Sequence, residues 1–239
     1  MKLNPKKCVF GVRSGKFLGF MISHRCIEAN PDKIRAVLGM KQPRNVREVQ
    51  CLAGCIATLG RFMSSSADKC QPFFRVLRQR NNFNWDKQAD EAFHSLETYL
   101  AQLPKIPSPV KGEVLVLYLA VSKHAVSAVL VVERVREQIP VYYISHALAG
   151  AEINYLLIEK FAYALAMASR KLRPYFEAHK ILVLTNQTLR NVLQKLDASG
   201  RLLTWAVELS HYDLAFEPRR AIKAQALANF LAESTAPAE

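Results

Sequence analysis

The side chains best suited to chemistry in this sequence are arginines of the first hundred residues. A guanidinium keeps its charge at physiological pH and matches the geometry of a phosphate. Arg75 and Arg78 are three residues apart and share one face of an expected helix, and Arg44 and Arg47 stand at the start of another. We predict contacts with a nucleic-acid backbone, and the alternative is a solvated helix face. The candidate residues are Arg44, Arg47, Arg61, Arg75, Arg78 and Arg80.

The distribution of charge supports the same interpretation. Residues 1–110 contain 18 Lys and Arg against 8 Asp and Glu, whereas residues 111–239 contain 15 against 12. A basic first half beside a nearly balanced second half predicts a polyanion partner for the first half, most simply nucleic acid. The alternative is positive charge that only keeps the protein soluble.

Other kinds of chemistry have little support. Cys51 and Cys55 are four residues apart and could share a metal, but without two further ligands nearby they are more simply half-buried small residues. The sequence has no HExxH, no GxSxG and no glycine-rich phosphate loop. Five cysteines, an odd number, indicate reduced intracellular thiols. The apolar run Val114–Val121 is far shorter than the roughly 20 residues that span a membrane, so we expect no membrane partner.

The elements that must position the arginines are a hairpin and a small helical cluster. Cys8–Ile22 predicts a β-hairpin whose loop is Arg13–Gly15. An isolated hairpin is marginal, so we expect it either to pack onto the helices or to be the least ordered part of the fold. Four helices are predicted, three begun by the N-caps Asn30, Asn45 and Asp86 and one over Pro72–Gln79.

A different pattern follows a proline-rich segment. Residues 103–112 predict a linker between a first domain, residues 1–102, and a second, residues 113–231, with a disordered tail over 232–239. The second domain predicts a five-stranded mixed sheet with helices on its faces, so the fold class is α+β (α/β). Its predicted strands are Val114–Val121, Ala125–Glu133, Val141–Ser145, Ile181–Thr185 and Tyr212–Phe216. Its predicted helices are Ile153–Leu172, closed by Pro174, then Thr188–Leu193, Leu202–Leu209 and Ile222–Leu231.

Both halves resemble a known family. The first half resembles the end of the palm and the thumb of reverse transcriptases from gypsy-type LTR retrotransposons, plant elements in particular. The segments that carry this resemblance are LNPKKCVFGV, KFLGFMIS, ANPDKIRAVLGM and NVREVQCLAGCIATLGRFM. The connector that follows resembles FNWDKQADEAFHSLETYL. The RNase H-like module is similar to LYLAVSKHAVSAVLV, PVYYISHALAGAEINY, IEKFAYALAMASRKLRPYF and ILVLTNQTLRNVL. The resemblance implies an RNA–DNA hybrid or duplex, and the rest of a Pol polyprotein, as partners.

The resemblance also implies which catalytic groups are missing. Polymerisation needs an Asp-Asp pair, which occurs nowhere in this sequence, so we expect no polymerase activity. RNase H chemistry needs carboxylates that hold two Mg²⁺ ions. The corresponding positions are Ala120, Phe161, Asn186 and Gln225. Because none of these side chains carries negative charge, we predict a degenerate RNase H-like domain with no metal and no other cofactor.

Neighbouring acids do not replace the missing ones. Glu159 is two residues before Phe161 and points roughly 200° away on a helix. We interpret four other acids as helix or strand caps and solvated charges: Glu133, Glu152, Asp197 and Asp213. The favoured function is an inactive polyprotein fragment that binds nucleic acid without sequence preference. Two alternatives remain: an Mg²⁺-dependent RNA–DNA hybrid ribonuclease, and a host-adopted protein-interaction module.

Overall fold

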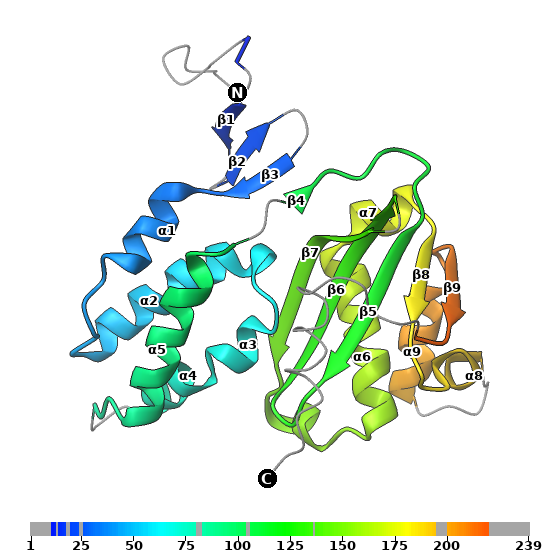
Figure 1. The fold of residues 1–239 in the computed structure, drawn as a ribbon. Helices are drawn as coiled ribbons and strands as arrows, with labels where there is room; N and C mark the ends of the chain where they lie inside the picture. Colours follow the sequence, from blue (N-terminus) through cyan, green and yellow to red (C-terminus); the bar gives the residue numbers. More distant parts are fainter. Residues whose placement is uncertain are drawn as a thin grey trace, which may run out of the picture.

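The computed structural model describes residues 11–12, 14–17, 20–23, 26–79, 83–103, 106–135, 137–194 and 200–219. Within them the chain forms two units that lie side by side (Figure 1). The first has a small antiparallel sheet and a cluster of helices, and the second has a mixed sheet with helices, which confirms the predicted α+β class. The predictions that fall outside the described residues concern Arg80, Asp197, Gln225, the helix Ile222–Leu231 and the tail 232–239.

The small sheet corrects the predicted hairpin. Its described strands are antiparallel neighbours in the order β1 (Ser14–Phe17), β2 (Phe20–Ser23), β3 (Cys26–Ala29) and β4 (Ile106–Pro107). A loop at Arg13–Gly15 is wrong, because Ser14 and Gly15 are paired strand residues. The register continues to Phe17 and Phe20, which are Cα partners, so Ser14 and Gly15 lie inside the ladder. Strand pairing therefore outweighs the local turn preference of Gly15.

The described part of this hairpin packs onto the helices. The Phe20 ring lies 5.9 Å from the ring of Phe62, which is fully buried among the helices. Of the two outcomes expected for the hairpin, the structure shows packing against the helical cluster.

The predicted linker contributes to both units. Ile106 is fully buried and pairs with Ile27, so β4 completes the small sheet. Further along, the Ser108 carbonyl accepts a hydrogen bond at 3.0 Å from Arg134 of the second unit, whose guanidinium also donates to both carboxylate oxygens of Glu113, at 2.7 and 2.8 Å. The segment between the units is thus fixed at both ends.

The helical cluster starts from well-formed N-caps. Asn30 accepts a hydrogen bond from the Asp32 N–H at 3.0 Å, and Asn45 accepts one from the Glu48 N–H at 2.9 Å. Asp86 likewise accepts from the Ala89 N–H, so all three predicted caps are confirmed. The elements are α1 (Pro31–Leu38), α2 (Val46–Leu59), the 3₁₀ turn η2 (Gly60–Phe62), α3 (Ser66–Lys69), α4 (Gln71–Arg78) and α5 (Lys87–Leu100).

The second unit is built on the predicted five-stranded mixed sheet. Its described strands are β5 (Leu115–Val121), β6 (Ala125–Arg134), β7 (Glu137–Ala147), β8 (Ile181–Leu184) and β9 (Leu214–Glu217). They lie in the order β7-β6-β5-β8-β9. The pairs β5–β6 and β6–β7 are antiparallel, whereas β8 runs parallel to both β5 and β9. The carboxyl ends of β5, β8 and β9 therefore meet at one edge of the sheet.

Helices cover the face of this sheet that lies behind it in Figure 1. They are the 3₁₀ turn η3 (Gly150–Asn154), α6 (Leu157–Lys171), α7 (Arg173–Ala178), α8 (Leu189–Gln194) and α9 (Gly200–Leu209). Leu115, Leu117 and Leu119 share one buried cluster with the inner side of α6. The predicted helix Ile153–Leu172 is too long at its start, because η3 ends at Asn154 before α6 begins at Leu157. Pro174 follows the end of α6 and occupies the first turn of α7.

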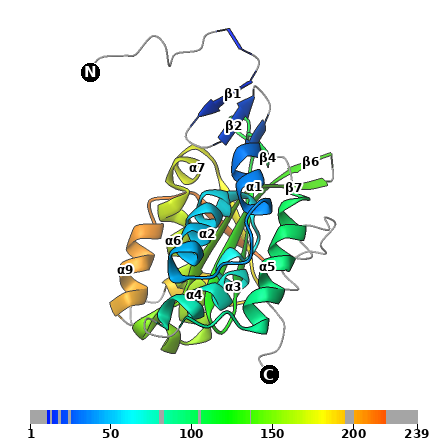
Figure 2. The ribbon, with the colours of Figure 1, turned by 90° about the vertical axis from the view of Figure 1, so that its left-hand side faces the viewer.

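Polar contacts join the two units at β7, at the residue after β5 and at α7. The helical cluster lies in front of the sheet in Figure 2, with α3 against β7. The Ala67 N–H donates to Ser145 Oγ at 3.0 Å, and Ser122 Oγ donates to Asp68 at 2.7 Å. Arg61 Nη2 donates to the Tyr175 hydroxyl at 2.9 Å. These contacts hold the units in one relative orientation.

The burial of a side chain in the second unit predicts how much its truncation lowers the free energy of unfolding. Leu117 on β5 is fully buried, so Leu117→Ala should lower the free energy of unfolding by about 2–5 kcal/mol. Val207 on α9 is 57% exposed, and Val207→Ala is the matched control, with an effect below about 0.5 kcal/mol. Urea denaturation followed by circular dichroism measures both. Equal effects would contradict this placement of the core.

The Glu113–Arg134 pair predicts a pH dependence. Hydrogen bonds from Arg134 hold the pKa of Glu113 down at about 2, from an ordinary value of 4.5. Because the folded-state pKa is the lower one, the pair stabilises the fold above about pH 4.5 and loses this contribution as the pH falls toward 2. Arg134→Met should return the pKa of Glu113 toward 4.5 in an NMR titration of its carboxyl carbon. Arg173→Met, which breaks the separate pair with Glu177, should leave the Glu113 pKa unchanged.

Candidate functional site

Two of the four predicted carboxylate positions meet at the edge where β5 and β8 end. Tyr118 pairs with Leu184, so Ala120 and Asn186, each two residues further along, lie at matching levels. Ala120 is 3% exposed and ends in a methyl group. The Asn186 side chain is exposed, and its Oδ1 accepts a hydrogen bond from the Arg219 N–H at 3.0 Å. We call Ala120, Asn186 and Arg219 the strand-end site.

Phe161 lies elsewhere. It is 7% exposed and belongs to the core cluster beneath α6, together with Leu119. Side chains alternate along a strand, so Leu119 and Ala120 point to opposite faces of the sheet. The structure therefore does not bring Phe161 to the strand-end site, and a benzyl side chain offers no ligand atom.

Glu159 is committed to a structural role. Its carboxylate accepts the Leu156 N–H at 3.0 Å, which caps the start of α6. The other oxygen accepts from Arg201 Nη2 of α9 at 3.1 Å, and the side chain is largely buried. Removing these partners from a buried carboxylate would strongly destabilise the folded protein. Glu159 is therefore not available to a metal at the strand ends.

The donor atoms at the strand-end site do not fit a pair of Mg²⁺ ions. Such ions require several oxygen ligands with negative charge. Ala120 supplies none, and the amide oxygen of Asn186 already accepts a hydrogen bond. In the described part of the chain, no group of three or more His, Cys, Asp or Glu residues is placed to hold a metal ion. Gln225, the fourth position, lies outside that part.

A cation of the chain itself lies at the strand ends. Arg219 Nη2 donates to the carbonyl oxygen of Leu119 at 2.7 Å. The Arg219 Nε is buried and has no hydrogen-bond partner among the described residues. Burial lowers the pKa of Arg219, and only the Tyr118 hydroxyl opposes this shift. Sequence reasoning missed this residue because no motif marks it and its contact on β5 is a hundred residues away.

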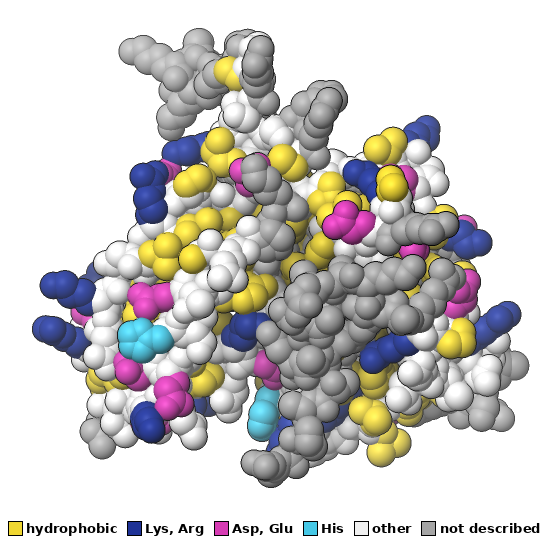
Figure 3. Space-filling model, in the orientation of Figure 1, with side chains coloured by type: hydrophobic (Ala, Val, Ile, Leu, Met, Phe, Trp, Pro, Cys, Tyr) yellow, Lys and Arg dark blue, Asp and Glu magenta, His cyan; other side chains and the backbone are white. Residues whose placement is uncertain are grey.

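The predicted phosphate-binding arginines separate into two groups. Arg44, Arg47 and Arg78 are exposed, and Lys and Arg side chains gather along the left-hand edge of the helical cluster in Figure 3. Arg75 is engaged with Asp86 and with Gln88. Arg61 binds Tyr175 and lies 4.6 Å from the centre of the Tyr142 ring. Phosphate contact stays a prediction for all five; Arg61 and Arg75 also make contacts within the protein, whereas the other three are exposed.

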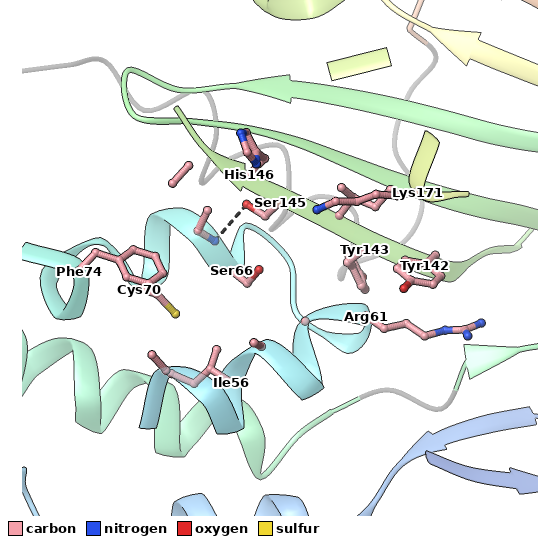
Figure 4. A pocket seen from close by; sticks show the side chains of 16 residues that line it. Ile56, Arg61, Ser66, Cys70, Phe74, Tyr142, Tyr143, Ser145, His146 and Lys171 are labelled. Carbon is pink, nitrogen blue, oxygen red and sulfur yellow. Dashed lines mark hydrogen bonds between the residues drawn. The ribbon is translucent and has the colours of Figure 1, made fainter. Parts of the chain in front are cut away.

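A cavity of about 340 Å³ lies between the two units (Figure 4). Ile56 and Phe74 form apolar wall on the helical side, and Ser145 and His146 of β7 face them. Lys171 reaches into it from the end of α6, and burial lowers the pKa of its amine. Burial also raises the pKa of the Cys70 thiol to about 12, so this sulfur is no nucleophile at neutral pH. The cavity offers space and positive charge but no catalytic constellation.

A hydrogen-bonded cluster beside α6 was also missed. The Tyr163 hydroxyl donates to Glu152 at 2.6 Å and lies 3.2 Å from His146 Nε2. Burial raises the pKa of Glu152, but bonds from Tyr163 and the Ala149 N–H outweigh it and the net pKa is lowered. Because Glu152 accepts the Ala149 N–H, it caps η3, which agrees with its interpretation as a cap.

Comparisons with known proteins agree with this architecture. Residues 112–212 match the model of the RNase H-like domain found in reverse transcriptase. The chain is 27% identical over 219 residues to the Retrovirus-related Pol polyprotein from transposon 297 of Drosophila melanogaster. It is 24% identical over 225 residues to the Transposon Tf2-3 polyprotein of Schizosaccharomyces pombe. Both alignments cover 91% of this chain but 20% and 17% of the relatives, so the chain spans about a fifth of their length.

Solved structures show the same fold. The foamy viral protease-reverse transcriptase in complex with RNA/DNA hybrid matches with a TM-score of 0.70 and 18% identity, over 88% of this chain and 30% of that one. The same kind of protein in complex with dsDNA matches with a TM-score of 0.69 and 16% identity, over 92% and 47%. No helix in the described ranges is both long and apolar enough to cross a membrane. Residues 112–212 thus form an RNase H-like domain of the reverse transcriptase type, in a chain homologous to retrotransposon Pol polyproteins.

Proposed function

We propose that this chain is a catalytically inactive part of the Pol polyprotein of a gypsy-type, plant-like retrotransposon, and that it binds nucleic acid without sequence preference. The strand-end site carries the proposal of inactivity. A methyl group, an amide and a guanidinium stand where hybrid cleavage would need carboxylates and two metal ions. The gypsy-type assignment rests on the ordered similarity of sequence segments in both halves.

The surface of the first unit supports the binding proposal. Residues 1–110 carry most of the excess positive charge, and Arg44, Arg47 and Arg78 leave their side chains free to reach a phosphate backbone. Foamy viral relatives of the same fold are solved with RNA/DNA hybrid and with dsDNA, which favours a duplex ligand here. Contacts of this kind depend on charge and are insensitive to base sequence.

The contact between the units supports a positioning role for the second unit. Arg61 links η2 to Tyr175 of α7, and Ala67 of α3 is bound to Ser145 on β7. A duplex held by the exposed arginines of the first unit would therefore have a fixed orientation relative to the RNase H-like sheet. We expect the second unit to act as a tether that orients a duplex without cutting it.

The proposal of inactivity predicts that the purified chain does not cleave a labelled RNA–DNA hybrid in the presence of Mg²⁺ or Mn²⁺. The reason is the lack of negatively charged ligands at the strand-end site. An active RNase H assayed in the same buffers is the positive control. Metal-dependent cleavage that co-purifies with the chain and disappears with a chelator would contradict the proposal and favour a ribonuclease.

The binding proposal predicts a steep dependence of hybrid affinity on salt. Because each phosphate contact releases condensed counterions, the triple variant Arg44→Gln, Arg47→Gln, Arg78→Gln should reduce the slope of log K against log salt by roughly 2–3. Fluorescence anisotropy of a labelled hybrid measures this slope. Arg173→Gln on α7, which is also exposed, is the control and should leave the slope unchanged. A shallow slope for the wild-type chain would remove the proposal.

A further inference from the structure

Arg219 extends across the end of one strand to reach another. It lies two residues beyond β9, which is separated from β5 by β8 in the sheet. Its N–H donates to Asn186, just after β8, and its Nη2 donates to the Leu119 carbonyl on β5. The side chain therefore spans the end of β8 and places its positive charge where the pairing between β5 and β8 stops.

The Leu119 carbonyl needs such a partner. The Leu115 N–H bonds to Lys180 beside β8, and residues two apart in a strand orient their polar groups alike, so the Leu119 carbonyl also points toward β8. The last β5–β8 pair is Tyr118 with Leu184, so Leu119 follows the end of the β5–β8 pairing, while it still pairs with Ala128 on β6. A buried carbonyl without a donor is unfavourable, and the Arg219 guanidinium supplies the donor.

Within the part of the chain that the structure describes, the electrostatics of Arg219 give no sign of a carboxylate partner. The pKa of Arg219 is lowered by burial, and a carboxylate neighbour would raise it instead. Ala120, next to the bonded carbonyl, is apolar, and Asn186 is neutral. The strand-end site therefore holds one positive charge from the chain itself and no negative charge among its three residues.

We propose that Arg219 takes the place of the divalent cations at the strand-end site and excludes them, an inference that rests on the proposed loss of catalysis. Loss of carboxylates alone would leave a neutral site that two restored acids could convert back into a metal site. With Arg219 present, restored carboxylates pair with the guanidinium, and an arriving divalent cation meets a like charge at close range.

The test restores two acids and varies the cation. The double variant Ala120→Asp, Asn186→Asp is prepared in three backgrounds: with Arg219 intact, with Arg219→Gln and with Arg219→Lys. Phe161 is left unchanged because it belongs to the buried core. Binding of Mn²⁺ is followed by the electron paramagnetic resonance signal of the free ion. We expect the Arg219→Gln background to bind Mn²⁺ about tenfold or more tightly than the other two, since only it lacks the like charge.

Thermal unfolding of the same proteins gives a second readout. Mn²⁺ should raise the Tm of the Arg219→Gln background and leave the Tm of the other two unchanged. If the double variant does not fold, Asn186→Asp alone, at an exposed position, carries the same comparison. Equal Mn²⁺ affinity in all three backgrounds would overturn the inference about Arg219. Hybrid cleavage by the wild-type chain would overturn the proposed loss of catalysis instead, so the two failures are distinguishable.

Discussion

The second unit depends on β5, which is hydrogen-bonded to β6 on one side and to β8 on the other. Leu117 and Tyr118, successive residues on its opposite faces, are both fully buried, so a shift in the register of β5 would exchange side chains of different size between two packed faces. This constraint fixes where the strand ends and therefore which side chains meet there. Asn186 and Arg219 lie just beyond the last β5–β8 pair, Tyr118 with Leu184, and Arg219 bonds both Asn186 and the Leu119 carbonyl beside Ala120.

The same packing explains how the fold can stay stable without metal-binding carboxylates. Burial of apolar side chains on both faces of the sheet stabilises the architecture without any help from a metal ion. An acid at position 120 would have to be neutralised by a cation, whereas alanine there needs no partner. Arg219 then satisfies the Leu119 carbonyl at the strand end, so the site gains a structural role.

The parts of the fold that depend on short-range chemistry could be predicted from the sequence. Asn30, Asn45 and Asp86 cap helices as expected, and the mixed sheet follows from the alternation of strand and helix patterns. The hairpin turn was misplaced because Ser14 and Gly15 pair with the next strand, and this pairing outweighs the preference of Gly15 for a turn. Arg61 and Arg75 lie within predicted elements, but their protein partners come from other segments. The position of Arg219 could not be predicted, because it depends on a contact between residues far apart in the sequence.

The central claim is that the wild-type strand ends have no affinity for divalent cations. Titration of Mn²⁺ into the full wild-type chain with an RNA–DNA hybrid present, followed by the resonance signal of the free ion, measures this directly. The account predicts a free-ion signal equal to that of the hybrid alone at every concentration. Stoichiometric uptake of Mn²⁺ by the protein–hybrid complex, beyond that of the hybrid alone, would contradict it.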